Sequence, residues 1–546
     1  MTAATSAKGL AYWPLDPSSP VMEMTAGDAL RRAAEQTPDR TALVEVAPEG
    51  APSTTGAAST QRRWTYRELL GDATKCAHWL LQRHRPGDRI CIWAPNVPEW
   101  VVLQYGAALA GLVLVTANPA LRAGELAYVI EQSQSSSLFY TESFRGTDMS
   151  AIAREVSKQT GALHSLTGWL AKVRETSEGA PLPDVGPDEP AQIQYTSGTT
   201  GKPKGALLSH KSLVTNASLV AGRAGTNKST VLSPMPLFHT AGAVLSCLGS
   251  IVTSSTYVLP LLFDPELMMK TIMTERCDVF FGVPTMQIAL LGHPKRAEYD
   301  LSSLRVSISG GASVPRELLK RIEAGFGCDM LAVYGQTEAS PIICQTSPSD
   351  SIDDKALTAG RPLPQVEVRI ADPVSGETVA VGVEGEIQAR GYQTMLGYYN
   401  MEAATCSTLT EDKWLRTGDL GTMDERGYLK VTGRLKDMII RGGENIYPAE
   451  LEARLLEHPR VANVSVFGAP DAHWGEVVCA AIQFREEQDR PTGEELKAHC
   501  RQALAPGKVP TRWFSCDAFP MTGSGKIQKF RLQEFLKDGQ LTELGT

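Results

Sequence analysis

Hydrophobic and polar positions recur with two different periods along the chain. From Thr65 to Leu80 the apolar residues fall at helical spacing, and Thr65 is a residue type that favours a helix N-cap. Residues 89–93 are mostly apolar and predict a strand. The uncharged stretch 100–121 predicts a buried helix over 101–110 that runs into a buried strand over 112–116.

Strands and helices alternate regularly after residue 229. Strands are predicted at 231–235, 279–283, 305–309 and 330–334, and helices at 241–252, 265–276, 285–291 and 315–325. This alternation is typical of a largely parallel sheet, in which ligands bind at the carboxyl ends of the strands. The loops expected there span residues 195–205, 236–239, 309–312 and 334–338.

The pattern changes after Gly360, where short strands separated by turns replace the alternation of helices and strands. They predict a small β-barrel-like subdomain, or a sheet, over residues 360–433. We therefore expect an α/β fold with a large N-terminal domain (1–435) of parallel or mixed sheets and helices, which includes this subdomain. A small C-terminal α+β domain (436–546) is expected to follow.

Composition narrows the class of protein. The 546 residues are 42% hydrophobic and 21% charged, with a formal net charge of −8 and no basic tail, so nucleic acid is not an expected partner. Ten cysteines without a C-x-x-C pair indicate reduced thiols and a cytoplasmic location rather than a zinc site. Prolines, glycines and polar residues interrupt the uncharged stretches 100–121 and 229–263, which favours buried core over a membrane span.

The segment Tyr195–Gly205 carries the most distinctive chemistry. It contains three glycines, four small hydroxyl residues and two lysines, and we expect a strand before it and a helix capped by Ser209 after it. Glycines allow close approach to backbone N–H groups, and hydroxyls and ammonium groups add donors and charge, so the segment suits a polyphosphate. It lacks the Walker A spacing, because Thr196 replaces the first glycine and Pro203 follows Lys202. The alternative is a flexible surface loop.

Six segments, in order, carry a family resemblance. They are 195–205, 334–338, 414–419, 433–437, 441–448 and 522–526. Together they resemble the adenylate-forming enzymes, a superfamily that includes acyl-CoA synthetases, nonribosomal peptide adenylation domains and beetle luciferases. The resemblance covers residues from about 64 to about 535. It implies that residues 1–435 form an AMP-binding domain and that 436–546 form a mobile domain.

The resemblance also implies a reaction in two halves. A carboxylate attacks the α-phosphate of ATP, which gives an acyl-adenylate and pyrophosphate, and the thiol of coenzyme A then displaces AMP. The expected cofactors and co-substrates are ATP, Mg²⁺ and coenzyme A. Because the first half joins two anions, the site must supply positive charge and hydrogen-bond donors.

The resemblance assigns nucleotide-binding roles to many residues. Those expected at the β- and γ-phosphates are Thr196, Ser197, Gly198, Thr199, Thr200, Gly201, Lys202 and Lys204. Those expected around adenine and the α-phosphate are Gly310, Gly311, Ala312, Tyr334, Gly335 and Gln336. Asp419 and Arg434 are expected at the ribose; the alternatives are a turn aspartate and a surface arginine.

Four residues are expected to act in catalysis by the same resemblance. Glu338 resembles the Mg²⁺ ligand, and Thr337 before it would contact the α-phosphate; alone, this pair is more typical of a helix cap. Lys526 resembles the lysine that bridges the substrate carboxylate and the α-phosphate, with a flexible tail loop as the alternative. His239 lies where the family gates its acyl pocket, with a hydrogen-bonded core histidine as the alternative.

A hinge and a thiol tunnel complete the expected machinery. Lys436 falls at the family's hinge, about which the small domain would rotate between the two half-reactions. Arg441, Gly442 and Gly443 would line the tunnel for the thiol after rotation; the alternative is a simple hairpin turn.

The acid substrate is predicted from the loop at His239. Amino-acid-activating relatives place an aspartate after the phenylalanine, whereas Phe238 is followed here by His239, and the neighbouring residues are apolar. We therefore expect a medium-chain fatty acid as the carboxylic acid substrate. The alternatives are an aromatic or other acid, a carrier protein as the thiol acceptor, or a non-catalytic nucleotide-binding relative. The oligomeric state is left open, with a homodimer as one alternative.

Overall fold

The computed structural model describes residues 9–49, 51, 54, 61–196, 202–310, 314, 316–442, 444–485, 489–521 and 527–545, with only the backbone of Asn445. The chain divides into two compact units. The first unit comprises residues 1–369, 388–416 and 424–429, and the second comprises residues 370–387, 417–423 and 430–546. The predicted boundary between residues 435 and 436 stays a prediction.

A nine-stranded sheet is the largest sheet in the described part of the first unit. Its order is β18 (Arg361–Pro362), β17 (Ile342–Gln345), β16 (Asp329–Gly335), β15 (Val306–Gly310), β14 (Val279–Gly282), β12 (Thr230–Leu232), β13 (Thr256–Pro260), β2 (Thr41–Val46) and β3 (Arg63–Thr65). The strands from β16 to β2 are parallel to one another, as predicted, and the strands at both edges are antiparallel.

A seven-stranded sheet forms the second layer of strands in this unit. Its order is β21 (Gly397–Tyr398), β11 (Lys204–Ser209), β10 (Pro190–Thr196), β5 (Val113–Ala117), β4 (Arg89–Trp93), β6 (Ser137–Tyr140) and β9 (Ala162–Ser165). The strands from β10 to β9 are parallel, whereas β11 and β21 are added antiparallel. A short hairpin, β7 (Ser143–Phe144) and β8 (Thr147–Asp148), lies apart from both sheets.

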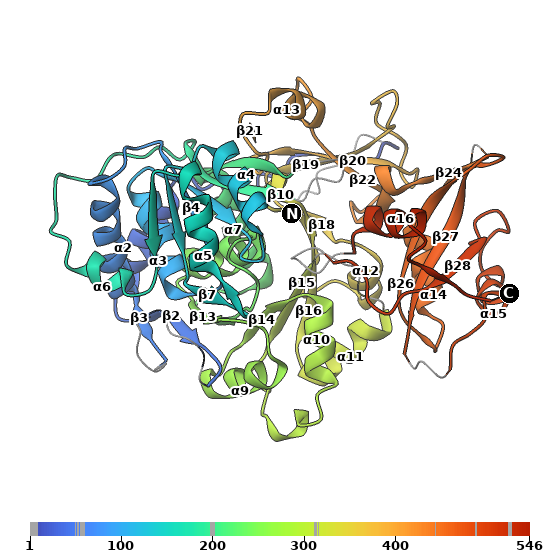
Figure 1. Ribbon diagram of the computed structural model, residues 1–546, viewed down its shortest axis with the longest axis horizontal. Helices are drawn as coiled ribbons and strands as arrows, with labels where there is room; N and C mark the ends of the chain where they lie inside the picture. The colour runs from blue at the N-terminus through green and yellow to red at the C-terminus, as the bar shows by residue number, and fades with distance from the viewer. Residues whose placement is uncertain are drawn as a thin grey trace. The chain divides into compact units, whose positions relative to one another are not determined.

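Helices accompany both sheets, and α10 and α11 lie beside β15 and β16 (Figure 1). The α-helices of the first unit are α1 (Ala26–Gln36), α2 (Tyr66–Leu81), α3 (Pro98–Leu109), α4 (Ala123–Ser133), α5 (Met149–Glu155), α6 (Trp169–Arg174), α7 (His210–Ala224), α8 (Gly249–Val252), α9 (Pro265–Glu275), α10 (Pro284–Leu291), α11 (Arg316–Phe326), α12 (Ile352–Leu357) and α13 (Glu402–Thr408). Four shorter or wider helices are η1 (Val156–Gln159), η2 (Ala241–Leu248), η3 (Arg296–Glu298) and η4 (Thr337–Ala339).

Local signals placed several helices correctly. The side chains of Thr65 and Ser209 accept hydrogen bonds from the first turns of α2 and α7, as their predicted N-cap positions require. Asp264 caps α9 in the same way. The uncharged stretch 100–121 forms most of α3 and then β5, and Trp100 is fully buried. No helix in the described part of the chain combines the length and apolar character needed to cross a membrane.

Three sequence predictions need correction. The segment Tyr195–Gly205 leads into β11 and not directly into a helix, because residues 204–209 pair with both β10 and β21. The single helix predicted at 241–252 is a π-helix, η2, followed by α8. The strands predicted within 360–433 belong to a five-stranded sheet whose order has two ends, and not to a closed barrel. That order is β1 (Tyr12–Trp13), β19 (Val366–Ala371), β20 (Gly385–Gly391), β22 (Leu415–Met423) and β23 (Leu429–Arg434).

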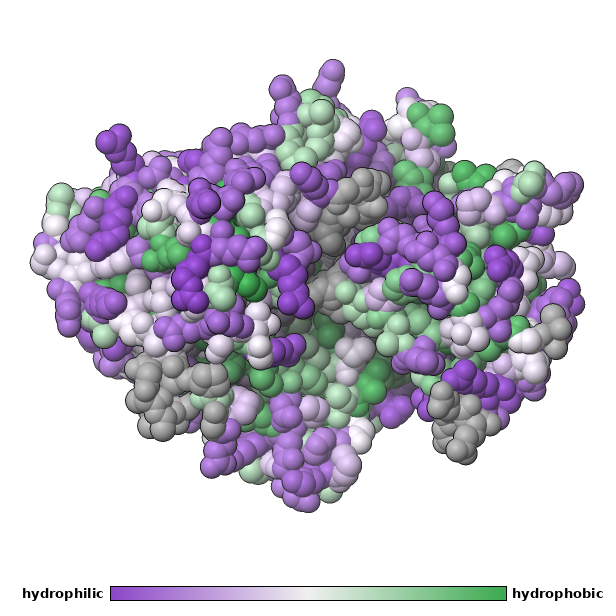
Figure 2. Space-filling view, viewed as in Figure 1, coloured by the Kyte–Doolittle hydropathy of each residue, from purple (hydrophilic) through white to green (hydrophobic). Residues whose placement is uncertain are grey.

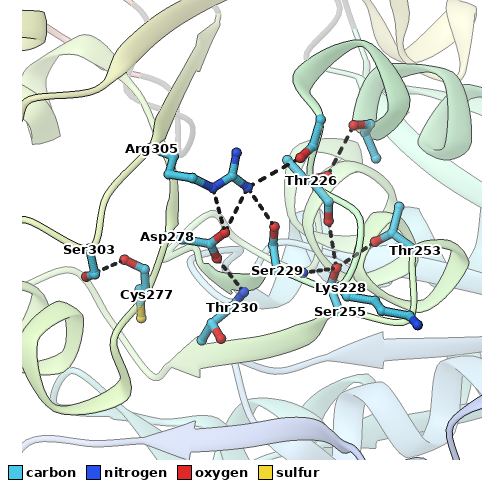
Figure 3. Close-up of polar contacts among 12 residues, drawn as sticks. Thr226, Lys228, Ser229, Thr230, Thr253, Ser255, Cys277, Asp278, Ser303 and Arg305 are labelled. Atoms are coloured by element: carbon cyan, nitrogen blue, oxygen red, sulfur yellow. Dashed lines mark hydrogen bonds and ion pairs between the residues drawn. The ribbon is translucent and has the colours of Figure 1, made fainter.

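A polar network ties together the amino ends of β12, β14 and β15 (Figure 3). The backbone N–H of Thr230 donates to Asp278 Oδ1 at 2.6 Å, and the Arg305 guanidinium donates to Asp278 Oδ2 at 3.1 and 2.8 Å. Arg305 also donates to Ser229 Oγ at 3.2 Å. This network fixes the strand ends opposite to those from which the candidate site loops emerge.

The second unit is a small α+β structure. Its sheet has the order β25 (Glu444–Ile446), β24 (Ile439–Arg441), β27 (Gly475–Phe484), β28 (Arg512–Ser515) and β29 (Thr542–Glu543), and β26 (Val461–Asp471) also pairs with β27. Its helices are α14 (Pro448–Leu456), α15 (Gly493–Arg501), α16 (Lys529–Lys537) and the short η5 (Leu435–Asp437). Two apolar clusters stabilise this unit, one around Val466 and Ile482 and one around Phe467 and Phe514.

Most large apolar side chains are buried inside the two units. The face drawn in Figure 2 carries many hydrophilic residues interspersed with smaller hydrophobic groups. The predictions of a mixed α/β fold, a large N-terminal part and a small C-terminal part are confirmed.

Candidate active site

The glycine- and hydroxyl-rich segment emerges from two paired strands. Thr196, the last residue of β10, lies opposite Lys204, the first residue of β11, and Thr196 Oγ1 donates to the Lys204 carbonyl at 3.4 Å. Gly205 fits there because a Cβ atom would lie 2.7 Å from Ile193 Cγ2. The predicted phosphate-binding residues that lie outside the described part are Ser197, Gly198, Thr199, Thr200 and Gly201.

Each lysine of this segment is placed over a tyrosine ring. Lys202 Nζ lies 5.1 Å from the centre of the Tyr128 ring, and the Tyr128 hydroxyl donates to the Pro203 carbonyl at 2.9 Å. Lys204 Nζ lies 4.9 Å from the centre of the Tyr398 ring. A cation above an aromatic face is attracted by the ring quadrupole, so both ammonium groups have a defined position beside the base of the segment.

Glu338 lies in η4, directly after β16, and is 9% exposed. Its Oε1 atom accepts a hydrogen bond from the Tyr398 hydroxyl at 2.7 Å, and its carbonyl accepts one from the Met395 N–H at 2.9 Å. Burial of the Tyr398 side chain raises its pKa, and the negative charge of Glu338 raises it further. The hydroxyl therefore keeps its proton and remains a hydrogen-bond donor. Glu338 and Lys204 therefore contact the same tyrosine side chain, Glu338 at the hydroxyl and Lys204 at the ring face.

The turn before Glu338 is shaped by a required glycine. At Gly335 a Cβ atom would clash with the Pro341 carbonyl oxygen, and the Gln336 N–H donates to that oxygen at 2.9 Å. Tyr334 and Gly335 end β16, and Thr337 begins η4, so these predicted site residues follow one another at a strand's carboxyl end. Of the other predicted adenine neighbours, Gly310 ends β15, whereas Gly311 and Ala312 lie outside the described residues.

The loop that carries His239 is anchored by Asn96, from the segment between β4 and α3, and by Thr116 of β5. The Asn96 amide donates to the Met235 carbonyl at 3.1 Å and accepts from the Leu237 N–H at 2.9 Å. Thr116 Oγ1, from β5, donates to the Phe238 carbonyl at 2.9 Å. These contacts fix the backbone on both sides of Leu237.

His239 accepts hydrogen bonds from the first residues of the π-helix η2. Its Nδ1 atom accepts a hydrogen bond from the Ala241 N–H at 3.2 Å, and its carbonyl accepts from Gly242 and Ala243, both at 3.0 Å. Because Nδ1 is an acceptor, the ring proton of the neutral imidazole is on Nε2. The predicted role of His239 at the acyl pocket stays a prediction.

In the second unit, two residues predicted at the ribose contact each other. Asp419 lies in β22 and is 7% exposed, and its Oδ1 atom accepts a hydrogen bond from Arg434 Nε at 3.1 Å. Lys436 follows in η5, where burial lowers its pKa. The turn aspartate considered as the alternative for Asp419 is excluded, because Asp419 lies inside a strand.

Two of the predicted thiol tunnel residues lie at the end of β24, where Arg441 is the last residue of the strand and Gly442 follows it. The Arg441 guanidinium stacks 4.5 Å from the centre of the Trp474 ring and donates to the Gly507 carbonyl at 3.0 Å. Gly442 has a φ of +59°, and its N–H donates to the Trp474 carbonyl at 2.8 Å. The positive φ favours glycine at this position, where a Cβ atom would also lie only 2.7 Å from Trp474 Cε3. Gly443 lies outside the described residues.

The predicted catalytic Lys526 also lies outside the described residues. The chain on either side of residues 522–526 is paired, since Met521 bridges Ile527 and the Gln528 N–H donates to the Pro520 carbonyl at 2.8 Å. Lys529 then donates to Glu452 at 2.7 Å.

Among the residues that the motifs assigned, Glu338 is the carboxylate expected to bind a divalent cation. The described residues contain no group of three or more histidine, cysteine or acidic side chains able to hold a metal ion by themselves. A Mg²⁺ ion bound together with phosphates needs only one or two protein carboxylates, because phosphate oxygens and waters complete its shell. Glu338, with Oε1 hydrogen-bonded and Oε2 as its second oxygen, fits that requirement.

Comparison with models of protein families shows which family the chain belongs to. The model of the AMP-binding enzyme family matches residues 30–399, and that of the AMP-binding enzyme C-terminal domain matches residues 450–526. The chain belongs to the AMP-binding enzymes. The resemblance predicted from the six segments is thereby confirmed.

Individual AMP-binding enzymes match nearly the whole chain. YngI of Bacillus subtilis (strain 168) is 38% identical, over 94% of this chain and 97% of that protein. The mitochondrial medium-chain acyl-CoA ligase ACSF2 of Danio rerio is 35% identical, over 95% of this chain and 89% of that protein. The crystal structure of ATP-bound MatB from Rhodopseudomonas palustris is similar with a TM-score of 0.83 and 28% identity, over 94% of this chain and 99% of that chain.

Several residues that shape the candidate site of this AMP-binding enzyme were not predicted. They are Asn96, Tyr128, Tyr398 and Trp474. Each meets its partner across a long separation in sequence, so no local pattern marks it. For Tyr398 the only local signal is the Gly-Tyr pair in a short strand, which could not reveal Glu338 as its partner.

Proposed function

We propose that this protein is an ATP-dependent, AMP-forming acyl-CoA ligase that activates a carboxylic acid, with medium-chain fatty acids as its preferred substrates. The predicted enzyme class agrees with the family match and with the acyl-CoA ligase relatives. The observation that carries the proposal is the placement of Glu338 and Lys204 on Tyr398, beside the strands that bear the glycine- and hydroxyl-rich segment. A carboxylate for a hard cation and an ammonium group for phosphates thus contact the same side chain.

In the proposed first half-reaction, an oxygen of the acid attacks the α-phosphorus of ATP. A new O–P bond forms, the bond between the α-phosphorus and the bridging oxygen breaks, and pyrophosphate leaves. We propose that Glu338 holds Mg²⁺, which would neutralise phosphate charge. Lys204 and the residues of the segment 196–202 would hold the β- and γ-phosphates, and Thr337 and Lys526 would contact the α-phosphate.

The proposed second half-reaction transfers the acyl group to coenzyme A. The thiolate sulfur attacks the acyl carbon, a C–S bond forms, and the bond to the AMP oxygen breaks. Asp419 and Arg434 would hold the ribose, with adenine between Tyr334 and the residues 310–312. Rotation about Lys436 would bring Arg441, Gly442 and Gly443 to the thiol.

The proposed acid follows from the loop that carries His239. An acidic residue for an α-ammonium group is absent after Phe238, and the neighbouring side chains are apolar. The name of the ACSF2 relatives, medium-chain acyl-CoA ligase, supports the same choice. Each buried methylene would contribute about 0.8 kcal/mol, which is how an apolar pocket would select chain length. A cytoplasmic location and a homodimer stay predictions.

A substrate panel tests the proposal. The protein is incubated with ATP, Mg²⁺ and coenzyme A and with acetate, hexanoate, octanoate, decanoate, palmitate or benzoate, and AMP, pyrophosphate and thioester are measured. We expect the highest kcat/KM with octanoate or its neighbours. Highest activity with benzoate would favour the aromatic-acid alternative. Pyrophosphate without thioester would favour a carrier-protein acceptor, and no AMP with any acid would overturn the proposed activity.

A further inference from the structure

Tyr398 lies between two groups of opposite charge. Its hydroxyl donates to Glu338 Oε1 at 2.7 Å, and its ring faces Lys204 Nζ, which lies 4.9 Å from the ring centre. Tyr398 is 8% exposed and Glu338 is 9% exposed, so the hydrogen bond between them is largely shielded from solvent, whereas Lys204 is half-buried. One side chain therefore contacts both the carboxylate and the ammonium group to which the proposed function gives separate roles.

The backbone of Tyr398 is fixed from two sides. On one side β21 pairs with β11, where Tyr398 lies opposite Ala206 and the Tyr399 N–H donates to the Gly205 carbonyl at 2.8 Å. On the other side, the Tyr398 N–H donates to Thr405 Oγ1 at 2.9 Å. Since β11 begins at Lys204, the tyrosine ring and the lysine are held by the same pair of strands.

We propose that Tyr398 is a positioning residue that aligns the Glu338 carboxylate for a divalent cation and holds the Lys204 ammonium group toward the same polyphosphate. This inference rests on the proposed function, which makes Glu338 the metal ligand and Lys204 a phosphate-binding residue. It adds a side chain that links the two.

The physical basis differs for the two partners. A carboxylate rotates freely about its last side-chain bond, and a hydrogen bond to Oε1 fixes that rotation and presents Oε2 in one direction. Such hydrogen bonds to a metal ligand typically change metal affinity by roughly 10- to 100-fold. The ring restricts a flexible lysine through a cation–π contact, which contributes less than the hydrogen bond to Glu338.

The two contacts can be separated by substitution. Tyr398→Phe removes the hydroxyl and keeps the ring, so it breaks the contact with Glu338 and retains that with Lys204. Tyr398→Leu removes both. Tyr399→Phe is the matched control, because the Tyr399 hydroxyl donates to Gln134 at 3.1 Å, away from Glu338.

Calorimetric titration of the full-length variants with ATP, once with Mg²⁺ and once with EDTA, tests the inference. The ratio of the two dissociation constants measures how strongly the metal tightens nucleotide binding. We expect Tyr398→Phe to lower this ratio roughly 10- to 100-fold and to leave ATP binding in EDTA unchanged. Tyr398→Leu should in addition weaken ATP binding in EDTA about two- to fivefold, and Tyr399→Phe should change neither value.

Glu338→Gln separates failure of the inference from failure of the proposed metal site. If Glu338→Gln abolishes the Mg²⁺ effect and Tyr398→Phe retains it in full, the role of Tyr398 is wrong and the metal ligand stands. If Glu338→Gln leaves the Mg²⁺ effect intact, both are wrong. A variant that only lowers the thermal midpoint, with an unchanged ratio, would identify Tyr398 as a purely structural residue and would also overturn the inference.

Discussion

The side-chain oxygen of Asn96 lies 2.9 Å from the backbone nitrogen of Leu237, which donates a hydrogen bond to it. The amide nitrogen of the same side chain donates to the carbonyls of Met235 and Pro260, at 3.1 and 3.3 Å. Asn96 is 7% exposed. A buried amide from the segment between β4 and α3 therefore fixes the backbone at Met235 and Leu237, in the loop that leads to His239.

Replacement of Asn96 by alanine should disturb this loop more than the nucleotide site. The substitution leaves buried backbone groups unpaired, at a cost of about 1–3 kcal/mol. We expect Asn96→Ala to raise the KM for the acid at least several-fold more than the KM for ATP. Thr116→Val, which removes the hydrogen bond to Phe238, should act in the same direction but more weakly. Equal increases in both KM values would contradict the assignment of this loop to the acid.

Gly242 requires the absence of a side chain. A Cβ atom there would overlap the carbonyl group of Pro236, with only 2.5 Å to its carbon. Gly242→Ala should therefore displace the loop before His239 and lower the free energy of unfolding by about 1–3 kcal/mol. Gly249→Ala is the control, because the nearest atom to its Cβ would be Val244 O at 3.7 Å. We expect that control to unfold at the same or a higher denaturant concentration, and equal destabilisation of both variants would refute the explanation.

The stability of the first unit should depend on pH through a buried histidine. Burial lowers the pKa of His210 to about 4, against an opposing effect of Asp28, and His210 Nδ1 accepts a hydrogen bond from the Ala26 N–H at 3.3 Å. The unfolded chain has the higher pKa, about 6.5, so it binds a proton first as the pH falls. Stability is therefore retained above about pH 6.5 and decreases by up to about 1.4 kcal/mol per pH unit between pH 6.5 and 4.

Denaturant unfolding between about pH 8 and 4.5 measures this dependence. His210→Asn offers an amide oxygen in place of Nδ1 and does not titrate, so it should remove the contribution of one proton from the slope. Burial also lowers the pKa of His164 to about 4. The stability of the His210→Asn variant should therefore still decrease as the pH falls, but less steeply than that of the wild type. An identical slope in the wild type and in His210→Asn would show that His210 is not responsible.

Sequence patterns were sufficient to predict those helices and strands whose signals lie within a few residues of the element. The N-caps at Thr65, Ser209 and Asp264 lie within three residues of the N–H groups that they bind. The bounds of α2 and α9 were predicted within one or two residues, and so was the start of α7. The parallel strands β14, β15 and β16 were predicted for a similar reason, since each is a short apolar segment between helices.

Features that depend on distant partners were missed. Strand β11 has only six residues and is defined by pairing with β10 and β21, the second of which is almost two hundred residues away. The π-helix η2 contains the same apolar residues as an α-helix would, and its wider turn cannot be read from their spacing. Tyr398 could be linked to Glu338 only after both had been placed in space. The motif residues were found by resemblance, and their roles stay predictions.

Lys526 should be needed for only one half of the reaction. If it bridges the acid and the α-phosphate, Lys526→Ala should reduce pyrophosphate release by several orders of magnitude. The same variant should convert supplied acyl-adenylate and coenzyme A to thioester at a rate near that of the wild type. Lys529→Ala is a useful comparison, because it breaks the contact with Glu452 and keeps Lys526. Equal loss of both half-reactions in Lys526→Ala would contradict the proposed role.

Lys436 provides the test of the proposed rotation. It lies in η5, between β23 and β24, where the chain would have to change its backbone angles. Proline fixes its own φ near −65° and restricts the residue before it, so Lys436→Pro should hold one arrangement. We expect pyrophosphate release to persist and thioester formation from supplied acyl-adenylate to fall at least 10-fold.

Lys436→Ala separates the backbone effect from the loss of the ammonium group. Alanine leaves φ free, so both half-reactions should continue at rates within a few-fold of the wild type. If Lys436→Ala fails in the same way as Lys436→Pro, the side chain and not the backbone is responsible. If Lys436→Pro catalyses both halves at wild-type rates, the two half-reactions do not require a change of backbone angle at this position, and the hinge must be sought elsewhere in the chain.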